Sequence, residues 1–188
     1  MRIRQASLVV AIPVLVVGAL AGPSFARSPA EKSKVKKITV TSAAFGNNKA
    51  IPSGFTCDGS AASPPLKFGS VPKAAKDVAL LMTDPDLPSG GTFVHWVAWH
   101  LPKSGVPEQT LPAGVVQGKN SIGNAAYAGP CPPAGSPPHH YVFTVSAVSK
   151  QITLAPGATA DELGAAIKGN VLAQGKLTGT YQRSTGAQ

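Results

Sequence analysis

Glycine and proline recur along the whole chain and keep its apolar runs short, and this limits the fold more than any other feature. The 188 residues include 20 glycines and 18 prolines, which lie between the apolar runs. Both residues interrupt helices and favour tight turns, so this spacing is typical of a domain with many short strands. There is no internal repeat and no heptad pattern. The chain is therefore predicted to be mainly β.

Five segments have the composition of strands, and residues 93–101 are the most informative of them. Both alternating faces of this segment are largely apolar, which predicts a central strand covered on both sides. Strict alternation would place Phe93, His95, Val97 and Trp99 on one face and Val94, Trp96, Ala98 and His100 on the other. The five predicted strands are Ile38–Ala43, Asp77–Thr83, Phe93–Leu101, Tyr141–Val148 and Lys176–Arg183.

A helix is predicted close to the C-terminus. Thr159 and Glu162 have the spacing of a capping box, apolar residues follow at helical intervals up to Ile167, and Gly169–Asn170 provides a break. Val171–Leu172 could continue as a further helical turn or two. Strands followed by late helices and a last strand argue against alternating βαβ units. The predicted fold is an antiparallel β-sandwich with one or two peripheral helices.

Residues 1–26 are predicted to form a secretory signal peptide. Arg2 and Arg4 precede the uncharged apolar run Ala6–Leu20, and Ser24–Ala26 places small residues at a cleavage site. The alternative is an uncleaved membrane anchor, although the apolar run is short for a membrane span. The mature protein is predicted to be exported, to the periplasm or outside the cell.

The net charge of +9 is concentrated in a basic, flexible tail at residues 27–37 and in the signal. From residue 38 onward there are 10 Lys and Arg and 7 Asp and Glu, so the predicted domain at 38–188 has a net charge of only +3. The tail is interpreted as a solvated spacer, with weak contact to an anionic membrane surface as the alternative. No aromatic residues alternate with its lysines, so no nucleic-acid partner is predicted.

Cys57 and Cys131 are the two cysteines of the chain. An oxidising compartment favours a structural disulfide between them, with two free buried thiols as the alternative. Their separation matches neither a CxxC redox motif nor a zinc site.

Unusual polar residues concentrate in three segments: residues 83–88, His95–Trp96, and residues 129–141. The first and third contain prolines at strand ends, where a fixed backbone can preorganise a pocket. Each segment also has a plain structural reading, since Asp84 and Asp86 could be turn residues and His95 a core histidine. The chain contains no GxSxG, Walker, GxGxxG or HExxH motif, and neither a metal site nor a cofactor is predicted.

Together these segments suit a small anion. Imidazole groups and backbone N–H groups beside glycine can donate hydrogen bonds to a phosphate-like group. The carboxylates would repel an anion unless they hold a histidine proton, so Asp84 or Asp86 is assigned to orienting and charging a histidine, or to meeting an amine on the ligand.

The same segments resemble the phosphatidylethanolamine-binding protein family, in particular its bacterial Raf-kinase-inhibitor-like branch. The resemblance runs from about Ile38 to Arg183 and rests on five ordered blocks. These are Phe55–Gly59 with Ser63–Leu66, Asp84–Asp86, Phe93–Trp96, Tyr127–Pro133 with His139 and Tyr141, and Leu177–Tyr181.

The resemblance implies a sandwich of antiparallel sheets with a small surface pocket for phosphate, acetate or phosphorylated head groups. It places the ligand-binding positions at Asp84, Asp86, His95, Gly129, Pro130, His139 and Tyr141. No settled catalytic activity goes with this family, whose members are described as head-group binders, kinase modulators and protease inhibitors.

Four positions depart from the family's usual pattern. Leu87 replaces an alanine and would narrow the pocket mouth, while His140 replaces an arginine, which would make anion binding weaker or dependent on pH. Phe68 and His100 replace a tryptophan and an asparagine.

The leading hypothesis is an exported binding protein, not an enzyme, whose pocket takes a phosphorylated or carboxylate ligand. In it His95 and His139 donate hydrogen bonds, and Tyr141 supplies a hydroxyl or a wall. The alternative is an inhibitor of a protease, or a binder of another envelope or kinase-like protein partner. A third hypothesis is a hydrolase that uses His95 with a carboxylate.

Overall fold

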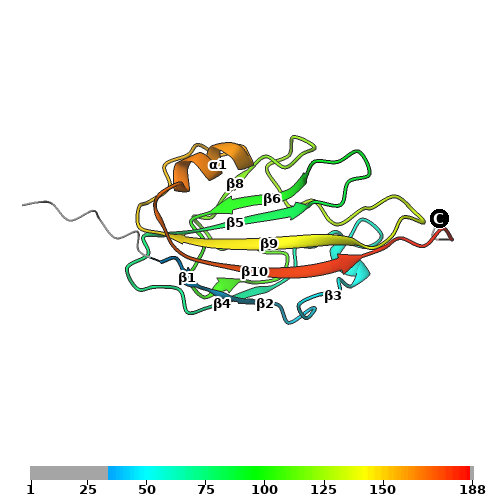
Figure 1. Cartoon of the computed structure of the whole chain (residues 1–188), viewed down its shortest axis with the longest axis horizontal. Helices are drawn as coiled ribbons and strands as arrows, with labels where there is room; N and C mark the ends of the chain where they lie inside the picture. The colour runs from blue at the N-terminus through cyan, green and yellow to red at the C-terminus, as the bar shows by residue number, and fades with distance from the viewer. Residues whose placement is uncertain (1–33, 187–188) are drawn as a thin grey trace, which may run out of the picture. The chain divides into compact units, whose positions relative to one another are not determined.

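A seven-stranded sheet forms the middle layer of the fold (Figure 1). The computed structural model describes residues 34–186. The strands of this sheet follow the order β1-β10-β9-β5-β6-β8, and β3 also pairs with β10. Their bounds are β1 Lys36–Lys37, β3 Lys49–Ala50, β5 Asp77–Asp84, β6 Phe93–Trp99, β8 Val116–Gly118, β9 His139–Val148 and β10 Val171–Tyr181.

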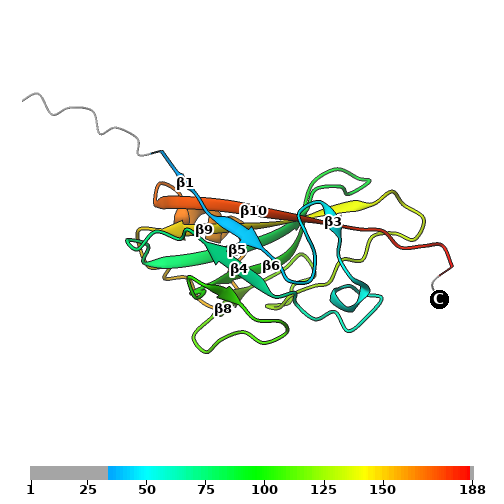
Figure 2. The same cartoon turned by 90° about the horizontal axis from the view of Figure 1, so that it is seen from below.

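A smaller sheet and one helix cover the two faces of this layer (Figures 1 and 2). The smaller sheet has the order β2-β4-β7, with β2 at Thr39–Thr41, β4 at Leu66–Gly69 and β7 at Gly105–Val106. A short 3₁₀ helix, η1, spans Ser53–Phe55, and the helix α1 spans Ala160–Ile167. The main core, which includes Trp96, Tyr141 and Phe143, lies between the sheets, and a second cluster lies beneath α1.

The predicted fold class is confirmed, because the chain is mainly β with two sheets and one short helix near its C-terminus. β5 is buried along most of its length because both of its faces are largely apolar, and β6 is covered on both sides as predicted. In β9 the buried residues from His139 to Val145 alternate with less buried ones such as His140 and Thr144. Trp96 and Ala98 face the main core, whereas Val97 and Trp99 face the cluster under α1. The sheet is not wholly antiparallel, since the short strands β1 and β3 run parallel to β10.

The capping box of α1 is present. The Thr159 hydroxyl accepts a hydrogen bond from the Glu162 N–H at 3.2 Å, and the Glu162 carboxylate accepts one from the Thr159 N–H at 2.7 Å. The suggestion that Val171–Leu172 continue the helix was wrong. Gly169 has φ +76°, a left-handed conformation that ends the helix, and Val171 pairs with Val148 as the first residue of β10.

The predicted signal peptide at 1–26 and the first part of the predicted tail, up to residue 33, lie outside the described residues. Lys36–Lys37 form β1, so the sheet begins two residues before the predicted domain boundary at Ile38. Among residues 34–186 the structure contains no helix with the length and apolar character needed to cross a membrane.

Candidate functional site

Three strands bring polar residues to one end of the large sheet. Asp84 is the last residue of β5, and the antiparallel neighbours β6 and β9 begin at Phe93 and His139. Since antiparallel strands start where their neighbours end, these residues meet at one edge, around a cavity of about 340 Å³. The cavity is lined by Cys57, Ala61, Asp84, Leu87, Phe93, His95, Ile122, Tyr127, Ala128, Gly129, Cys131, Pro132, Pro133, His139 and Tyr141.

The Asp84 carboxylate orients the His139 ring at the bottom of this cavity. One carboxylate oxygen lies 2.7 Å from His139 Nδ1, and the other accepts a hydrogen bond from the Asp86 N–H at 2.8 Å. Both side chains of the pair are about 95% buried. An ionised carboxylate only accepts, so Nδ1 carries the proton, and Nε2 remains available to the cavity. This is the arrangement that the hypothesis of a carboxylate-oriented histidine requires.

A β-bulge in β6 determines the direction of His95. Met82 of β5 pairs with Trp96 and Thr83 pairs with Val94, so His95 has no residue opposite it. The extra residue shifts the alternation of the strand by one position. Val94 therefore packs under α1 with Val97 and Trp99, and His95 does not share their face as strict alternation predicted.

His95 instead lies beside aromatic residues of the cavity. Its ring is 4.7 Å from that of Phe93 and meets the Tyr141 ring edge-on at 5.1 Å. Its Nδ1–H donates to the Ala128 carbonyl at 2.8 Å, while the Ala128 N–H donates to the His95 carbonyl at 2.9 Å. Burial lowers the pKa of His95, against the opposing effects of the Ala128 hydrogen bond and the Asp84 charge. The ring is thus neutral at neutral pH, with a lone pair on Nε2.

Tyr141 presents a hydroxyl without a partner. The residue is fully buried, and its oxygen makes no hydrogen bond within the part of the chain that the structure describes. Burial raises the pKa of Tyr141 and the Asp84 charge raises it further, so the hydroxyl stays protonated and can donate. An unpartnered buried hydroxyl is costly, and a bound ligand could satisfy it.

Asp86 and Pro130 were predicted as binding residues but do not line the cavity. The Asp86 carboxylate accepts hydrogen bonds from the His140 N–H and from His140 Nδ1, both at 2.7 Å. Burial opposes this effect, yet the His140 hydrogen bonds lower the pKa of Asp86. Pro130 is buried and accepts a hydrogen bond from the Cys57 N–H at 3.1 Å. Both residues therefore support the walls of the cavity.

Gly129 does line the cavity, at a point where the chain passes close to another loop. A side chain there would come within 3.0 Å of the Thr56 backbone, so any other residue would push the two loops apart by a few tenths of an ångström.

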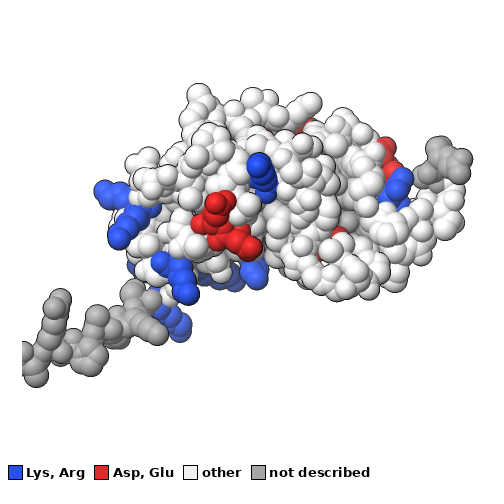
Figure 3. All heavy atoms as spheres, turned by 90° about the horizontal axis from the view of Figure 1, so that it is seen from above, with Lys and Arg blue, Asp and Glu red and all other residues white. Residues whose placement is uncertain are grey.

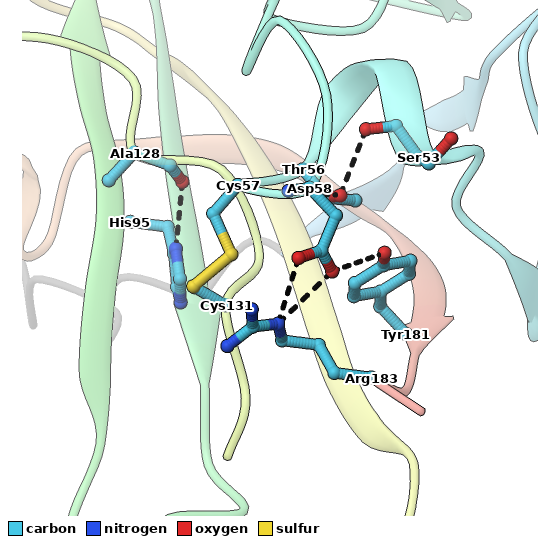
Figure 4. The surroundings of a disulfide bond; sticks show 9 residues. All are labelled: Ser53, Thr56, Cys57, Asp58, His95, Ala128, Cys131, Tyr181 and Arg183. Atoms are coloured by element: carbon cyan, nitrogen blue, oxygen red, sulfur yellow. Dashed lines mark hydrogen bonds and ion pairs between the residues drawn. A yellow bond between two sulfur atoms is a disulfide. The ribbon is translucent and has the colours of Figure 1, made fainter. Parts of the chain in front are cut away.

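Cys57 and Cys131 form a disulfide that joins the same two loops (Figure 4). Their Cα atoms are 5.4 Å apart. Next to the disulfide, the Arg183 Nε–H donates to both Asp58 carboxylate oxygens, at 2.9 and 3.1 Å, and the Tyr181 hydroxyl donates to one of them at 2.7 Å. The disulfide and this network tie the end of β10 to the cavity wall.

Most of the cavity wall was not predicted from the sequence. Leu87 and Cys131 had been noted for other reasons, but Phe93, Ile122 and Tyr127 were not proposed as lining residues. Tyr127 is a rigid part of the wall, since its hydroxyl donates to the Phe55 carbonyl at 2.7 Å. The block-by-block family pattern could have suggested Phe93 and Tyr127, because both lie within matched blocks. Ile122 lies outside every block.

No Lys or Arg is present among the described residues that line the cavity. On the face drawn in Figure 3, most of the basic side chains lie toward the end of the molecule where β1 begins, and few lie near the C-terminal end. The Tyr141 hydroxyl can therefore donate a hydrogen bond in the cavity, whereas the Nε2 atom of each imidazole can donate only when it carries a proton. The cavity has no permanent positive charge. Protonation of a histidine is the available way to meet an anion.

Comparisons with known proteins agree with this architecture. The sequence profile of the family "phosphatidylethanolamine-binding protein" matches residues 41–182. A UPF0098 protein of Pyrococcus horikoshii is 40% identical over 161 residues, which cover 81% of this chain and 79% of the relative. LppC of Mycobacterium tuberculosis, named as a candidate lipoprotein, is 39% identical over 147 residues, covering 77% of this chain and 72% of LppC.

A solved structure is also similar. It is the phosphatidylethanolamine-binding protein homologue CT736 from Chlamydia trachomatis, which is 34% identical with a TM-score of 0.74 over 79% of this chain and 99% of CT736. The chain therefore belongs to the phosphatidylethanolamine-binding protein family, in its bacterial Raf-kinase-inhibitor-like branch.

Proposed function

We propose that this protein is an exported binding protein whose cavity takes a small ligand through a phosphate or carboxylate group. A pocket of this kind is typical of the family. The observation that carries the proposal is the convergence of His95, His139 and the unpartnered Tyr141 hydroxyl on one cavity. Each of these groups is held in place by protein contacts, so little freedom is lost when a ligand arrives.

The geometry supports a role for each group in this proposal. His139 is oriented by Asp84 and His95 by the Ala128 carbonyl, so in both rings Nδ1 is engaged and Nε2 is the atom left for the ligand. Tyr141 can donate its hydroxyl proton to a ligand oxygen. The nearby Asp84 charge would repel an anion, and a hydrogen bond from a neutral imidazole leaves that charge in place, so the offset has to come from a protonated imidazole in the cavity.

Titration of the purified domain with acetate and with inorganic phosphate, followed by NMR of the histidine side chains, tests the proposal. We expect the His95 and His139 signals to shift at millimolar ligand. His100 is the internal control, because it pairs with Asp77 at 2.7 Å, at the opposite end of β5. If neither pocket histidine responds, or if His100 responds equally, the proposal is wrong.

Acetate binding is expected to strengthen as the pH falls. Burial lowers the pKa of His95, so above that pKa the Nε2 lone pair faces the anion and must take up a proton before it can donate. Linkage then gives an affinity that rises by up to about tenfold for each pH unit lowered, down to the lowered pKa of the free protein. Isothermal titration calorimetry between pH 8 and about 6 measures this slope, since acetate itself remains ionised there. A flat profile would show that His95 is not involved.

We propose binding without turnover. The His139–Asp84 pair resembles the base of a hydrolase, but among the described lining residues there is no serine or threonine, and both cysteines are bonded to each other. Turnover of an acyl or phosphoryl ester that disappears in His95→Ala would contradict this proposal.

Export is supported by the disulfide and by the relative LppC, which is named as a candidate lipoprotein. Fractionation of cells producing the full chain tests it directly.

Inhibition of a protease, or binding of another envelope or kinase-like partner, stays a prediction. A stoichiometric protein partner retained by the purified domain, and lost when acetate fills the cavity, would favour that second reading.

A further inference from the structure

The mouth of the cavity is apolar, in contrast to its polar floor. The floor consists of Asp84, His95, His139 and the Tyr141 hydroxyl, which all lie at strand ends of the large sheet. Toward solvent the lining changes to an apolar collar, which comes mainly from loops. The collar is made up of Leu87, Phe93, Ile122 and Pro133, which are all partly or fully exposed.

Ile122 is the most informative residue of this collar. Its exposed fraction is 62%, and Val35 is the other large apolar residue that is exposed among the described residues. A single exposed apolar residue is ordinary on a protein surface, but this one lies at the mouth of a cavity.

The loop that carries Ile122 is built rigidly around Asn120. This asparagine is buried, its side-chain oxygen accepts hydrogen bonds from the Ile122 and Asn124 N–H groups at 3.1 and 3.0 Å, and its amide donates to the Ala126 carbonyl at 3.0 Å. Ser121 also exchanges two hydrogen bonds with Val94 of β6, at 2.8 and 2.9 Å. The isoleucine is therefore held in position at the mouth and cannot fold back into the core.

The size of the cavity points in the same direction. At about 340 Å³ it has room for roughly ten water molecules. Acetate or inorganic phosphate on the floor would displace only part of this water and leave the collar wet. A ligand with an apolar body would displace the rest and bury the collar.

We infer that the cavity is built for an amphiphilic acid, a carboxylate or phosphate monoester that carries an aryl or short alkyl group. In this arrangement the acidic group meets His95 and His139, while the apolar body contacts Ile122 and the rest of the collar. This inference rests on the proposed function, because it requires the acidic group to bind at the floor. It adds the chemical class of the ligand.

Matched ligand pairs test it by calorimetry on the purified domain: phenylacetate against acetate, and phenyl phosphate against inorganic phosphate. We expect each aryl ligand to bind about tenfold more tightly or better than its small partner, because the ring buries apolar surface. The two pairs also distinguish a carboxylate ligand from a phosphate ligand. If acetate and phosphate bind but the aryl ligands bind no better, the inference is wrong and the proposed function stands. If none of the four ligands binds, the proposed function itself fails.

Two surface variants complete the test. Ile122→Ser should weaken phenylacetate binding about fivefold more than it weakens acetate binding, because the collar contact that it removes is made by the aryl group. Val35→Ser is the matched control, since Val35 is 51% exposed and belongs to no described cavity, and it should change neither affinity. Equal loss of both ligands in Ile122→Ser, or an equal effect of Val35→Ser on phenylacetate, would overturn the assignment.

Discussion

At the scale of single residues, the ring and the hydroxyl of Tyr141 have different roles. Its ring lies in the main core and against the His95 ring, and these contacts contribute to stability. Its hydroxyl, in contrast, is buried without a partner among the described residues. A buried hydroxyl without a hydrogen-bond partner is a natural contact for a bound molecule.

Tyr141→Phe should therefore leave the stability unchanged or slightly raised, within about 0.5 kcal/mol, because no hydrogen bond is lost with the hydroxyl. The same change should weaken acetate binding about tenfold, as expected for one hydrogen bond to a charged group. Urea denaturation and calorimetry measure the two effects. A large loss of stability would reveal a structural partner for the hydroxyl, and unchanged binding would remove Tyr141 from the site.

At the scale of elements, β10 depends on glycine where residues outside the strands lie close to its inner face. The buried positions of β10 alternate along the strand and include Gly175 and Gly179. A side chain at Gly175 would come within 2.1 Å of the Ile38 carbonyl oxygen, and one at Gly179 would contact Ile51 at 2.5 Å. The glycines thus let the segment that links the two sheets lie directly on β10.

Gly175→Ala should destabilise the protein by about 1 to 3 kcal/mol, because the neighbouring backbone has to move. Gly164→Ala in α1 is the matched control. Nothing lies within 4 Å of a side chain at Gly164, and alanine favours helix more than glycine does, so this variant should gain up to about 1 kcal/mol. Thermal or urea denaturation of both variants checks the pair. Equal effects in the two variants would show that the close approach to Ile38 is unimportant.

At the scale of the whole molecule, the disulfide joins two loops that are 74 residues apart in the sequence. Between Cys57 and Cys131 the chain forms β4 to β8, so the bond closes a loop through both sheets. The same bond lies in the cavity wall. Folding stability and the shape of the cavity are therefore coupled through one covalent link.

The double variant Cys57→Ala/Cys131→Ala should lose about 4 kcal/mol of stability, the value expected from the entropy of a closed loop of this length. Reduction of the wild-type protein should produce a similar loss and should leave the double variant unaffected, which makes reductant the control. Denaturation with and without dithiothreitol provides the measurement. A loss below about 1 kcal/mol would mean that contacts between the loops, such as the Cys57 hydrogen bond to Pro130, suffice to hold them together.

The sequence by itself determined the features that depend on local patterns. Short apolar runs between glycines and prolines predicted the β fold, and the Thr159–Glu162 spacing predicted the start of α1. The polar residues at the ends of predicted strands indicated where a site would form, and the cysteine count indicated the disulfide. These features follow from the conformational preferences of neighbouring residues or from the chemistry of one residue type. The amino-acid sequence alone is therefore enough to predict them.

The tertiary structure alone decided the features that depend on register and on contacts between distant segments. The bulge opposite Met82 and Thr83 turns His95 into the cavity, and strict alternation along β6 cannot reveal it. Val171 joins β10 because β9 offers it a partner, although its local sequence also suits a helix. The apolar collar forms because loops far apart in the sequence, those of Leu87 and Ile122, close over the polar floor. Strand pairing and loop closure are non-local, and their free energy is set only when the whole chain has packed.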